Sequence, residues 1–566
     1  MFWAHKTYVQ LEAPKKWRTF YDYAGLMRVI QLLSLVGCLA QADAVPDTTL
    51  AVERYLSNES PIALQGVLNN IGSNGAKALE ASTGIVIASP STVDPNYFYT
   101  WTRDSALTYR YLIDSANSSL QSLIEDYAVA QVRLQVISNP SGDLKSGAGL
   151  GEPKFYTNET AFLEYWGRPQ RDGPALRAMA LISFGNDRLA LGQNTTVKDI
   201  IWPVVRNDLA YVAQYWNLST FDLWEEVNGS SFWTTAVQHR ALVEGAKFAT
   251  AVGDSCQDCD SQAPNILCML QNYWNGNSIN SNIQVQSETY DRSGLDCNSI
   301  LTSIHTFDPD PDVGCDAMTF QPCSDRALAN HKAVIDSFRD IYVINSNRSS
   351  GQAVAIGRYP EDIYQGGNPW YICTFAAAEQ LYDALWTYNS SKSITITDIS
   401  QPFFDDLIPG ISLGTYTSSS QQYENIIQAI QSYADGFVSI AEEYTPSDGS
   451  LAEQFSRNNG TAMSAVDLTW SYASFLTMQR ARQGKHGSSW GAAHANKLPT
   501  QCSGGGAVGS YLTPSATAFP QNEEGTFGSA SASAAQATPT GTASGTAASP
   551  TKSKSAGNRI RPFPWS

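Results

Sequence analysis

The segment Glu424-Asn-Ile-Ile-Gln-Ala-Ile-Gln-Ser-Tyr-Ala-Asp-Gly-Phe-Val-Ser-Ile-Ala-Glu-Glu-Tyr444 repeats its large apolar residues at helical spacing. The apolar positions are Ile426, Ile427, Ile430, Tyr433, Ala434, Phe437 and Ile440. Steps of three, four and seven residues put them on one face of an α-helix. The segment therefore predicts an amphipathic helix that packs on a core.

The same periodicity recurs along much of the chain. Phe375 to Tyr388 and Phe232 to Val252 carry comparable stripes, and Ser464-Ala465-Val466-Asp467 has the pattern of a capping box that opens a helix over Leu468 to Gln483. Sustained strand alternation is hard to find. We expect one all-α domain over residues 45–502, with long loops rich in glycine, proline and asparagine between its helices.

Composition narrows the function. Hydrophobic residues make up 43% of the 566 residues and aromatic residues 11%, while the formal net charge is −17. An acidic surface repels phosphate backbones, so nucleic acid is excluded as a partner. Many aromatic rings with few charges are typical of proteins that bind neutral polar molecules, although large cores also contain many rings.

Both ends of the chain differ from this domain. Met27-Arg28, the apolar run Val29 to Ala40 and Ala42-Asp43-Ala44 predict a secretory signal within residues 1–44, too short to span a membrane. We expect a secreted, extracellular protein with no membrane partner. Residues 503–566 are rich in glycine, serine, alanine and threonine and predict a disordered tail. The glycosylation motif Asn-x-Ser/Thr occurs at Asn58, Asn117, Asn158, Asn194, Asn217, Asn228, Asn347, Asn389 and Asn459.

An unusual acidic segment precedes one predicted helix. Phe221 to Phe232 places Asp222, Glu225 and Glu226 among Leu223 and other large apolar residues. Apolar surroundings and neighbouring carboxylates both raise a carboxyl pKa, which keeps a proton available near neutral pH. The alternative is an ordinary helix entry with acids near its N-terminus.

Four further loops combine acids, arginine and aromatic residues. They are Asn96–Ser105 with Arg103-Asp104, Tyr165–Pro174 with Trp166, Gly357–Trp370 with Arg358, and Ser450–Phe455 with Glu453. Each has a purely structural alternative, such as an ion pair at a helix start. Together they favour glycosidic hydrolysis, which needs one protonated and one ionised carboxyl and aromatic or polar groups that hold the sugar.

The sequence lacks the motifs of metal, nucleotide and serine-hydrolase sites. The six histidines have no metal-like spacing, Cys256-x-x-Cys259 has no second pair to complete a zinc site, and no phosphate loop or G-x-S-x-G elbow occurs. We expect no metal and no cofactor.

Taken together, seven motifs resemble those of the fungal-type glucoamylases of glycoside hydrolase family fifteen. They are Tyr99-Thr-Trp-Thr-Arg-Asp104, Ser138-Asn-Pro-Ser-Gly-Asp-Leu144, Gly149-Leu-Gly-Glu-Pro-Lys-Phe155, Trp166-Gly-Arg-Pro-Gln-Arg-Asp-Gly-Pro174, Asp222-Leu-Trp-Glu-Glu-Val-Asn-Gly-Ser-Ser-Phe232, Gly357-Arg-Tyr-Pro-Glu-Asp362 and Asp467-Leu-Thr-Trp-Ser-Tyr472. The resemblance implies an (α/α)6 barrel of twelve helices. It also implies an exo-acting enzyme that releases β-glucose from starch, maltodextrins and maltose by inverting cleavage of α-1,4 and, more slowly, α-1,6 bonds.

The resemblance also implies roles for individual residues. Glu225 is expected to be the general acid and Glu453 the general base. The expected substrate-binding residues are Tyr97, Trp101, Arg103, Asp104, Trp166, Asp222, Leu223, Glu226, Arg358, Tyr364, Trp370 and Trp470. The implied disulfides are Cys256–Cys259, Cys268–Cys502 and Cys315–Cys323; Cys373 is expected to be a free thiol, and Cys297 is left open.

Three departures from the family pattern stand out. Phe455 replaces an expected tyrosine two residues after Glu453, Gln365 and Gly366 alter the loop before Trp370, and we expect no starch-binding β-sandwich after the tail. Two other readings stay open: a trehalase-like or glucodextran-cleaving enzyme with the same barrel, and a catalytically silent carbohydrate-binding protein. A monomer is the default expectation.

Overall fold

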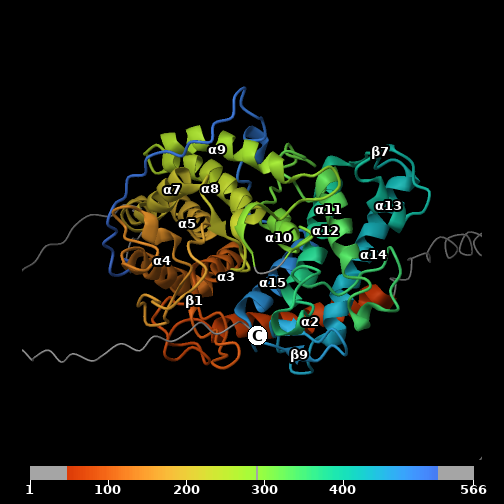
Figure 1. The fold of residues 1–566 in the computed structure, drawn as a ribbon, viewed down its shortest axis with the longest axis horizontal. Helices are drawn as coiled ribbons and strands as arrows, with labels where there is room; N and C mark the ends of the chain where they lie inside the picture. Colours follow the sequence, from red (N-terminus) through yellow and green to blue (C-terminus); the bar gives the residue numbers. More distant parts are fainter. Residues whose placement is uncertain (1–46, 289–290, 521–566) are drawn as a thin grey trace, which may run out of the picture. The chain divides into compact units, whose positions relative to one another are not determined.

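The computed structural model describes residues 47–288 and 291–520 (Figure 1). Almost all of these residues belong to one compact unit that starts at Ala51. The signal segment predicted within residues 1–44 and the last part of the predicted tail, residues 521–566, lie outside the described residues.

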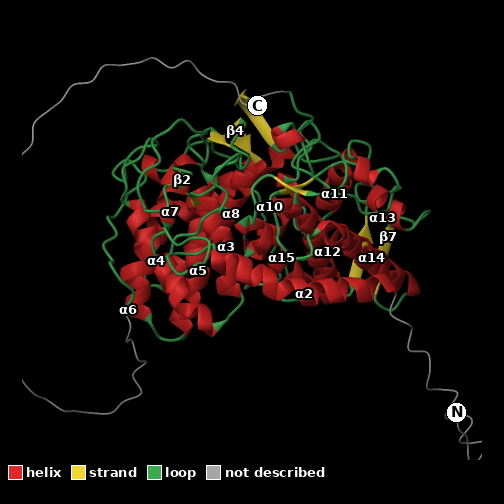
Figure 2. Cartoon of the chain, turned by 90° about the horizontal axis from the view of Figure 1, so that it is seen from below, coloured by secondary structure: helices red, strands yellow, loops and turns green. Residues whose placement is uncertain are grey.

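Helices dominate this unit, and the strands are short (Figure 2). The helices are α2 (Asp47–Asn69), α3 (Thr102–Asp114), α4 (Gln121–Gln135), α5 (Asp172–Ala190), α6 (Asn194–Thr196), α7 (Trp202–Tyr215), α8 (Phe232–Ala251), α9 (Gln257–Leu270), α10 (Asn298–His305), α11 (Asp325–Ser337), α12 (Tyr371–Ser391), α13 (Gln401–Leu407), α14 (Gln421–Tyr444) and α15 (Thr469–Arg482). The strands are β1 (Thr100–Trp101), β2 (Lys154–Phe155), β3 (Thr220–Phe221), β4 (Asn228–Ser231), β5 (Asn282–Ser287), β6 (Ser393–Ile396), β7 (Gly414–Thr417), β8 (Gln454–Phe455) and β9 (Ala462–Met463). They pair antiparallel as β1–β2, β3–β4–β5, β6–β7 and β8–β9.

Six helices form a closed inner ring. In the order α3, α5, α8, α10, α12 and α15, each packs on the next, and α15 packs back on α3 (Figure 1). The remaining long helices alternate with them along the chain and pack outside: α4 on α3, α7 on α5, α9 on α8, α11 on α10 and α14 on α12. On the outside of α15, Gln479 donates to the carbonyl of Leu56 in α2. This arrangement is the expected (α/α)6 barrel.

The outer and inner helices differ in how much of their surface is apolar and buried. The outer helix α14 buries its predicted stripe, with Ile426, Ile430 and Phe437 fully enclosed, and exposes the opposite face. The inner helix α12 is buried on nearly every side, because it contacts the ring on two sides and α14 on a third. The helix predicted over residues 424–444 is confirmed, and it starts where the side chain of Ser420 accepts the backbone N–H of Tyr423.

The loops that precede the six inner helices meet at one end of the ring. Hydrogen bonds or ring contacts join the loop before α3 to those before α5, α8 and α12, and the loop before α8 to the one before α10. The loop before α15 contacts the loop before α12. At the end of this loop, Thr469 N donates to the carbonyl of Ala88, which lies in the loop before α3. Loops far apart in sequence therefore surround one space.

The expected capping box at the start of α15 is wrong. The helix begins at Thr469 after Leu468, which supplies no side-chain cap, and Ser464 and Asp467 both have positive φ values. The Ser464 hydroxyl instead donates to Glu453. Because α15 begins at Thr469, Ser464 stands too early in the chain to be its N-cap.

The expectation of a free Cys373 is also wrong. The structure pairs Cys256 with Cys259, Cys268 with Cys502 and Cys315 with Cys323, the three bonds that the resemblance implies. It adds a fourth bond between Cys297 and Cys373, whose Cα atoms are 5.9 Å apart. The bond forms because α10 and α12 are neighbours in the ring, and these cysteines stand at their N-terminal ends.

The first part of the predicted tail is ordered against the barrel. Residues 503–520 run beside α7, where Ala507 N donates to the carbonyl of Ala213 and Leu512 N donates to Asn207 Oδ1. Phe519 is buried and its ring lies 5.9 Å from that of Phe184. The low-complexity composition did not predict this ordered segment, because backbone groups and one aromatic residue supply its contacts.

Candidate active site

Glu225 lies at the end of the ring where the six loops meet. Its Oε1 accepts hydrogen bonds from Trp101 Nε1 at 2.7 Å and Gln170 Nε2 at 2.9 Å, and lies 3.5 Å from Arg103 Nη2. The backbone of Glu225 has a φ of +68°. Such conformations cost roughly 1–3 kcal/mol outside glycine and persist where the surrounding structure imposes them, often at functional sites.

Arg103 is fixed by buried partners. Its Nη1 donates to Gln170 Oε1 at 2.9 Å and to Asp172 Oδ2 at 3.0 Å, and Trp233 Nε1 holds the same Asp172 oxygen at 2.8 Å. The neighbouring Asp104 is buried, which raises its pKa to about 6 although the charge of Arg103 acts to lower it. The guanidinium is therefore oriented before any ligand binds.

Glu453 lies on the loop before α15, at the same end of the ring, and is only 1% exposed. Its Oε2 accepts hydrogen bonds from the Ser464 hydroxyl and from Gln454 Nε2, the latter at 3.1 Å. Burial raises the pKa of the carboxyl to about 7, and the hydrogen bond from Ser464, the charge of Arg358, Tyr97 and Gln454 only partly offset this rise. These groups favour the ionised carboxylate against its burial.

Tyr97 connects the two acids. Its pKa is raised by burial first and then by the charges of both Glu453 and Glu225. Its ring lies 5.5 Å from that of Trp101, the residue that donates to Glu225. Glu225 and Glu453, separated by more than two hundred positions in the sequence, thus face one space.

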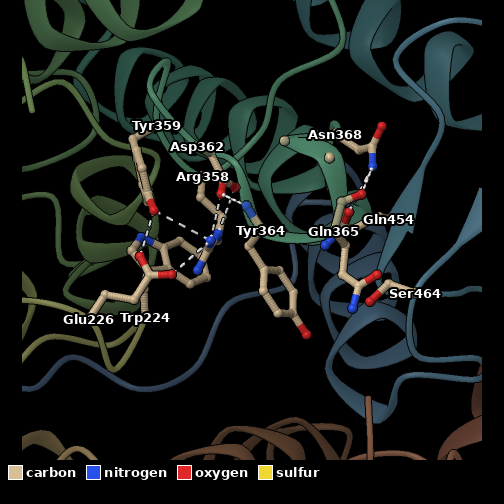
Figure 3. A network of polar contacts seen from close by, with 12 residues as sticks. Trp224, Glu226, Arg358, Tyr359, Asp362, Tyr364, Gln365, Asn368, Gln454 and Ser464 are labelled. Atoms are coloured by element: carbon tan, nitrogen blue, oxygen red, sulfur yellow. Dashed lines mark hydrogen bonds and ion pairs between the residues drawn. The ribbon is translucent and has the colours of Figure 1, made fainter. Parts of the chain in front are cut away.

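A second charged group flanks this space. Arg358 Nη2 donates to Glu226 Oε1 at 3.0 Å and to Asp362 Oδ1 at 2.7 Å, while Tyr359 donates to Glu226 Oε2 at 2.6 Å (Figure 3). Arg292 binds the same Glu226 oxygen at 2.5 Å. Burial acts to raise the pKa of Glu226, but the two arginines outweigh it and the pKa is lowered.

Tyr364 stands between the two halves of the site. Figure 3 shows its ring between the cluster of Glu226 and Arg358 on one side and Gln454 with Ser464 on the other. Its hydroxyl lies 2.8 Å from that of Tyr97. The centre of the Trp370 ring lies 6.3 Å from that of the Tyr364 ring and 5.5 Å from that of the Trp224 ring. Aromatic faces and hydroxyls therefore line the middle of the site.

Lys154 fills an aromatic cage beside Glu225. Its Nζ lies 3.2 Å from the centre of the Trp166 ring, and the rings of Phe162, Tyr99 and Trp101 lie within 4.7 Å. Burial lowers the pKa of the amine to about 8, partly offset by the negative charge of Glu225. Trp166, an expected substrate-binding residue, thus forms one wall of this cage and also contacts the ring of Trp101.

The other predicted residues are buried near these groups. Asp222 accepts the backbone N–H groups of Glu226 and Val227 and shapes the turn that presents Glu225. Leu223 and Trp470 are buried, Trp470 in the first turn of α15. All predicted site residues therefore lie on the loops or first turns at this end of the ring.

Sequence reasoning missed several partners of these residues. They are Lys154, Gln170, Asp172, Arg292, Tyr359 and Ser464. Gln170 and Asp172 lie within a quoted motif and could have been found there. Arg292 stands in a segment without any motif, and only the fold brings it to Glu226. No group of three or more His, Cys, Asp or Glu residues in the described part of the chain could hold a metal ion.

Comparison with known proteins agrees with this geometry. Residues 61–480 match the family model described as glycosyl hydrolases family 15. The chain belongs to this family. It is 55% identical over 476 residues to a glucoamylase of Neurospora crassa, covering 83% of this chain and 75% of that one, and 54% identical to Glucoamylase-1 of Arthroderma benhamiae, covering 81% and 74%.

Solved structures of glycosyl hydrolase family 15 share the fold. The family 15 glucoamylase from Hypocrea jecorina superposes with a TM-score of 0.82 at 55% identity, covering 84% of this chain and 80% of that one. The Hormoconis resinae glucoamylase gives 0.79 at 50% identity, with 83% and 80% covered. Because of this membership the chain is a glycoside hydrolase. No described helix combines the length and apolarity required to cross a membrane.

The departures from the family 15 pattern occupy defined positions. Phe455 packs between the rings of Tyr371 and Tyr444, at 4.8 and 5.4 Å, so its edge is in an aromatic stack and not in a polar contact. Gln365 has a φ of +51° and its amide reaches Asp94 Oδ1 at 3.2 Å, bridging two loops at the rim.

Proposed function

We propose that this family 15 protein is a secreted, exo-acting glucoamylase that hydrolyses terminal α-1,4 bonds of starch and maltodextrins, and α-1,6 bonds more slowly, with inversion. The observation that carries the proposal is that Glu225 and Glu453 lie on loops at the same end of the ring, before α8 and α15, each with its own set of hydrogen-bond donors. Relatives named glucoamylase, at up to 55% identity, support the substrate class.

Glu225 suits the role of general acid. Its hydrogen bonds from Trp101 and Gln170 and its contact with Arg103 all reach Oε1, so we assign Oε2 as the oxygen that delivers the proton. In the proposed reaction Oε2 protonates the glycosidic oxygen as the C1–O bond breaks. The side chain is 17% exposed, which leaves it accessible to a substrate in the space beside it.

Glu453 suits the role of general base. Ser464 and Gln454 hold Oε2, which leaves Oε1 to accept a proton from water. That water attacks C1 from the face opposite the leaving group, so an α-bond yields β-glucose. Inverting carboxyl pairs stand about 6.5–9.5 Å apart to make room for the water.

Binding of one terminal glucose follows from the surrounding groups. We assign Arg103 and Asp104 to sugar hydroxyls, with Arg358 and the Trp101 and Trp370 rings beside them. Contacts of Tyr97 with Tyr364 and of Asp94 with Gln365 join two loops at the rim. A rim closed on that side supports attack on chain ends and not on internal bonds.

Glucose release from maltose, isomaltose and trehalose tests this function against its alternatives. We expect fast release from maltose, slower release from isomaltose and none from trehalose. A preference for trehalose or isomaltose would favour another glycosidase with the same barrel, and no release from any of the three would favour a silent carbohydrate-binding protein.

A further inference from the structure

A groove of about 750 Å³ lies on the outside of the barrel, where the outer helix α14 meets the segment that precedes Arg358. One wall is the segment Val343–Ala353, with Ser346, Asn347 and Arg348, and the other is α14, with Ser432 and Glu443. The volume falls in the range of roughly 300–1,000 Å³ that is usual for small-ligand sites.

The lining of this groove suits a sugar. Its apolar side includes Leu407, Ala429 and the rings of Tyr433 and Tyr444. Its polar side includes Gln352 and the ion pair between Arg348 Nη2 and Glu443 Oε2 at 3.2 Å, which bridges the two walls. Sugars combine C–H faces that pack on apolar or aromatic surface with hydroxyls that need hydrogen-bond partners.

One glycosylation motif lies in the groove itself. Asn347-Arg348-Ser349 forms an Asn-x-Ser motif, and Asn347 is exposed and lines the groove. Other motifs are placed differently: Asn228 is half-buried in β4, paired with Phe221 and Ser287, and Asn58 lies within α2.

The segment that carries Asn347 is continuous with a loop of the site. It leads directly into residues 354–358, which are buried and end at Arg358 of the site. Several contacts already hold it: Arg339 donates to the carbonyls of Ser349 and Gln352, Asn345 binds Phe338 and Ala355, and Ile344 N donates to the carbonyl of Arg457. A ligand bridging this segment and α14 would restrict its opening.

We propose that Asn347 carries an N-linked glycan whose first sugars occupy this groove and hold Val343–Ala353 against α14. The inference rests on the proposed secretion, because N-glycosylation occurs in the secretory pathway. The glycan would be a ligand attached covalently to one wall of the groove. Because it is already attached there, its binding to the groove costs less entropy than the binding of a free sugar. It stabilises the segment without contacting the two catalytic carboxyls.

Peptide mapping of the full chain, expressed in a glycosylating eukaryotic secretion host, tests occupancy. Denatured protein cut by trypsin gives a peptide of residues 340–348 with a single motif. We expect it to carry hexosamine and hexose mass that enzymatic release removes, converting Asn347 to aspartate. If this peptide were unmodified while Asn117 or Asn194 is glycosylated, the inference about Asn347 would be wrong, and the proposed secretion would still stand. If all motifs were unmodified, the proposed secretion would fail with it.

Limited proteolysis of the native protein tests the seating of the glycan. Ser349→Ala removes the motif, and Ser349→Thr keeps it as the matched control. We expect trypsin to cut after Arg348 several-fold faster in Ser349→Ala than in Ser349→Thr or in the unaltered chain, with equal glucose release from maltose in all three. Asn194→Gln, which removes an exposed glycan site elsewhere, should leave this rate unchanged. Equal cleavage in both Ser349 variants would show that the groove does not hold the glycan.

Discussion

The proposed hydrolysis depends on the proton of a single residue, Glu225. The substitution Glu225→Gln keeps the hydrogen bonds to Trp101 and Gln170 largely in place but removes the transferable proton. General acid catalysis contributes about 10²–10⁴-fold, so we expect kcat on maltose to fall by that factor or more while maltose binding is retained.

Glu164→Gln provides the control, since Glu164 is an exposed carboxyl on the loop that carries Trp166. Steady-state kinetics and calorimetric titration with maltose measure the two effects separately. Near-normal turnover in Glu225→Gln, or an equal loss in Glu164→Gln, would remove Glu225 from the acid role.

Ser464 sets the pH range over which Glu453 can act. Its hydroxyl donates to the Glu453 carboxylate and lowers the pKa of that group, so Ser464→Ala should raise it. The base works only when ionised. A raised pKa therefore leaves less active enzyme at a given acid pH, and we expect the acidic limb of the kcat/KM profile to move to higher pH.

Two further variants separate this effect from damage to the fold. Ser464→Gly also removes the hydroxyl but suits the φ of +64°. Ser471→Ala breaks a hydrogen bond to the carbonyl of Ala452, next to the base, without touching the carboxylate. Both Ser464 variants should shift the limb and Ser471→Ala should not; a profile unmoved by Ser464→Gly would count against the assignment.

The sequence predicted the acids better than their partners. Large apolar residues around Glu225 and a weakly polar segment around Glu453 mark the two acids only weakly, and their expected roles come from the resemblance to the family motifs. Arg292 and Ser464 reach their carboxylates through loop geometry that no local pattern encodes. Ser464 was even misread as a helix cap, since a serine before an acidic residue looks the same in both roles.

At the scale of elements, the bond between Cys297 and Cys373 ties two neighbouring inner helices where the site begins. It closes a loop of 76 residues, and loop-closure entropy then predicts a stabilisation of about 4.5 kcal/mol. We expect the double variant Cys297→Ala with Cys373→Ala to lower the free energy of unfolding by an amount of that order, measured by urea denaturation.

The bond between Cys256 and Cys259 is the matched control. It spans only 3 residues, for which the same entropy relation gives less than ~2 kcal/mol. Removing it should therefore cost clearly less. A loss equal to that of the long-range pair would mean that chain entropy does not explain the fourth disulfide.

A helix could be predicted from the sequence where one of its faces is exposed to solvent and the opposite face is buried. The stripe of α14 appears in the sequence because the opposite face is exposed. The inner helices α8 and α12 are buried on most sides, so periodicity marks their existence but not their neighbours. Ring order, and with it the proximity of Cys297 to Cys373, follows from closure of the barrel and not from any single helix.

At the scale of the whole molecule, the barrel encloses acids that make its stability depend on pH. Glu379 and Asp383 lie four residues apart on α12, both buried, beside a cavity of about 120 Å³ at the far end of the inner ring. Glu379 accepts from Thr477 at 2.7 Å, and Asp383 lies 3.4 Å from His486. Burial, and for Asp383 the neighbouring Glu379, raise both pKa values.

The sign of the pH effect follows from these raised values. The unfolded chain loses these protons near pH 4, whereas the folded protein keeps them to higher pH. Stability from the pair is therefore complete below about pH 4 and declines as pH rises toward the folded-state values. We expect Glu379→Gln to flatten that decline by up to ~1.4 kcal/mol per pH unit.

Urea denaturation at several pH values between 4 and 8 measures this slope. The exposed Glu424→Gln on α14 is the control and should leave the slope unchanged. An unaltered slope in Glu379→Gln would show that this carboxyl titrates alike in the folded and unfolded chain.

The central claim is that Glu225 and Glu453 form an inverting pair across one closed barrel end. The most direct test is proton NMR of the first glucose that the purified protein releases from maltodextrin, recorded before mutarotation mixes the anomers. The account predicts the β-anomer, because water activated by Glu453 attacks opposite the bond that Glu225 protonates. The α-anomer as first product would contradict the roles assigned to both residues.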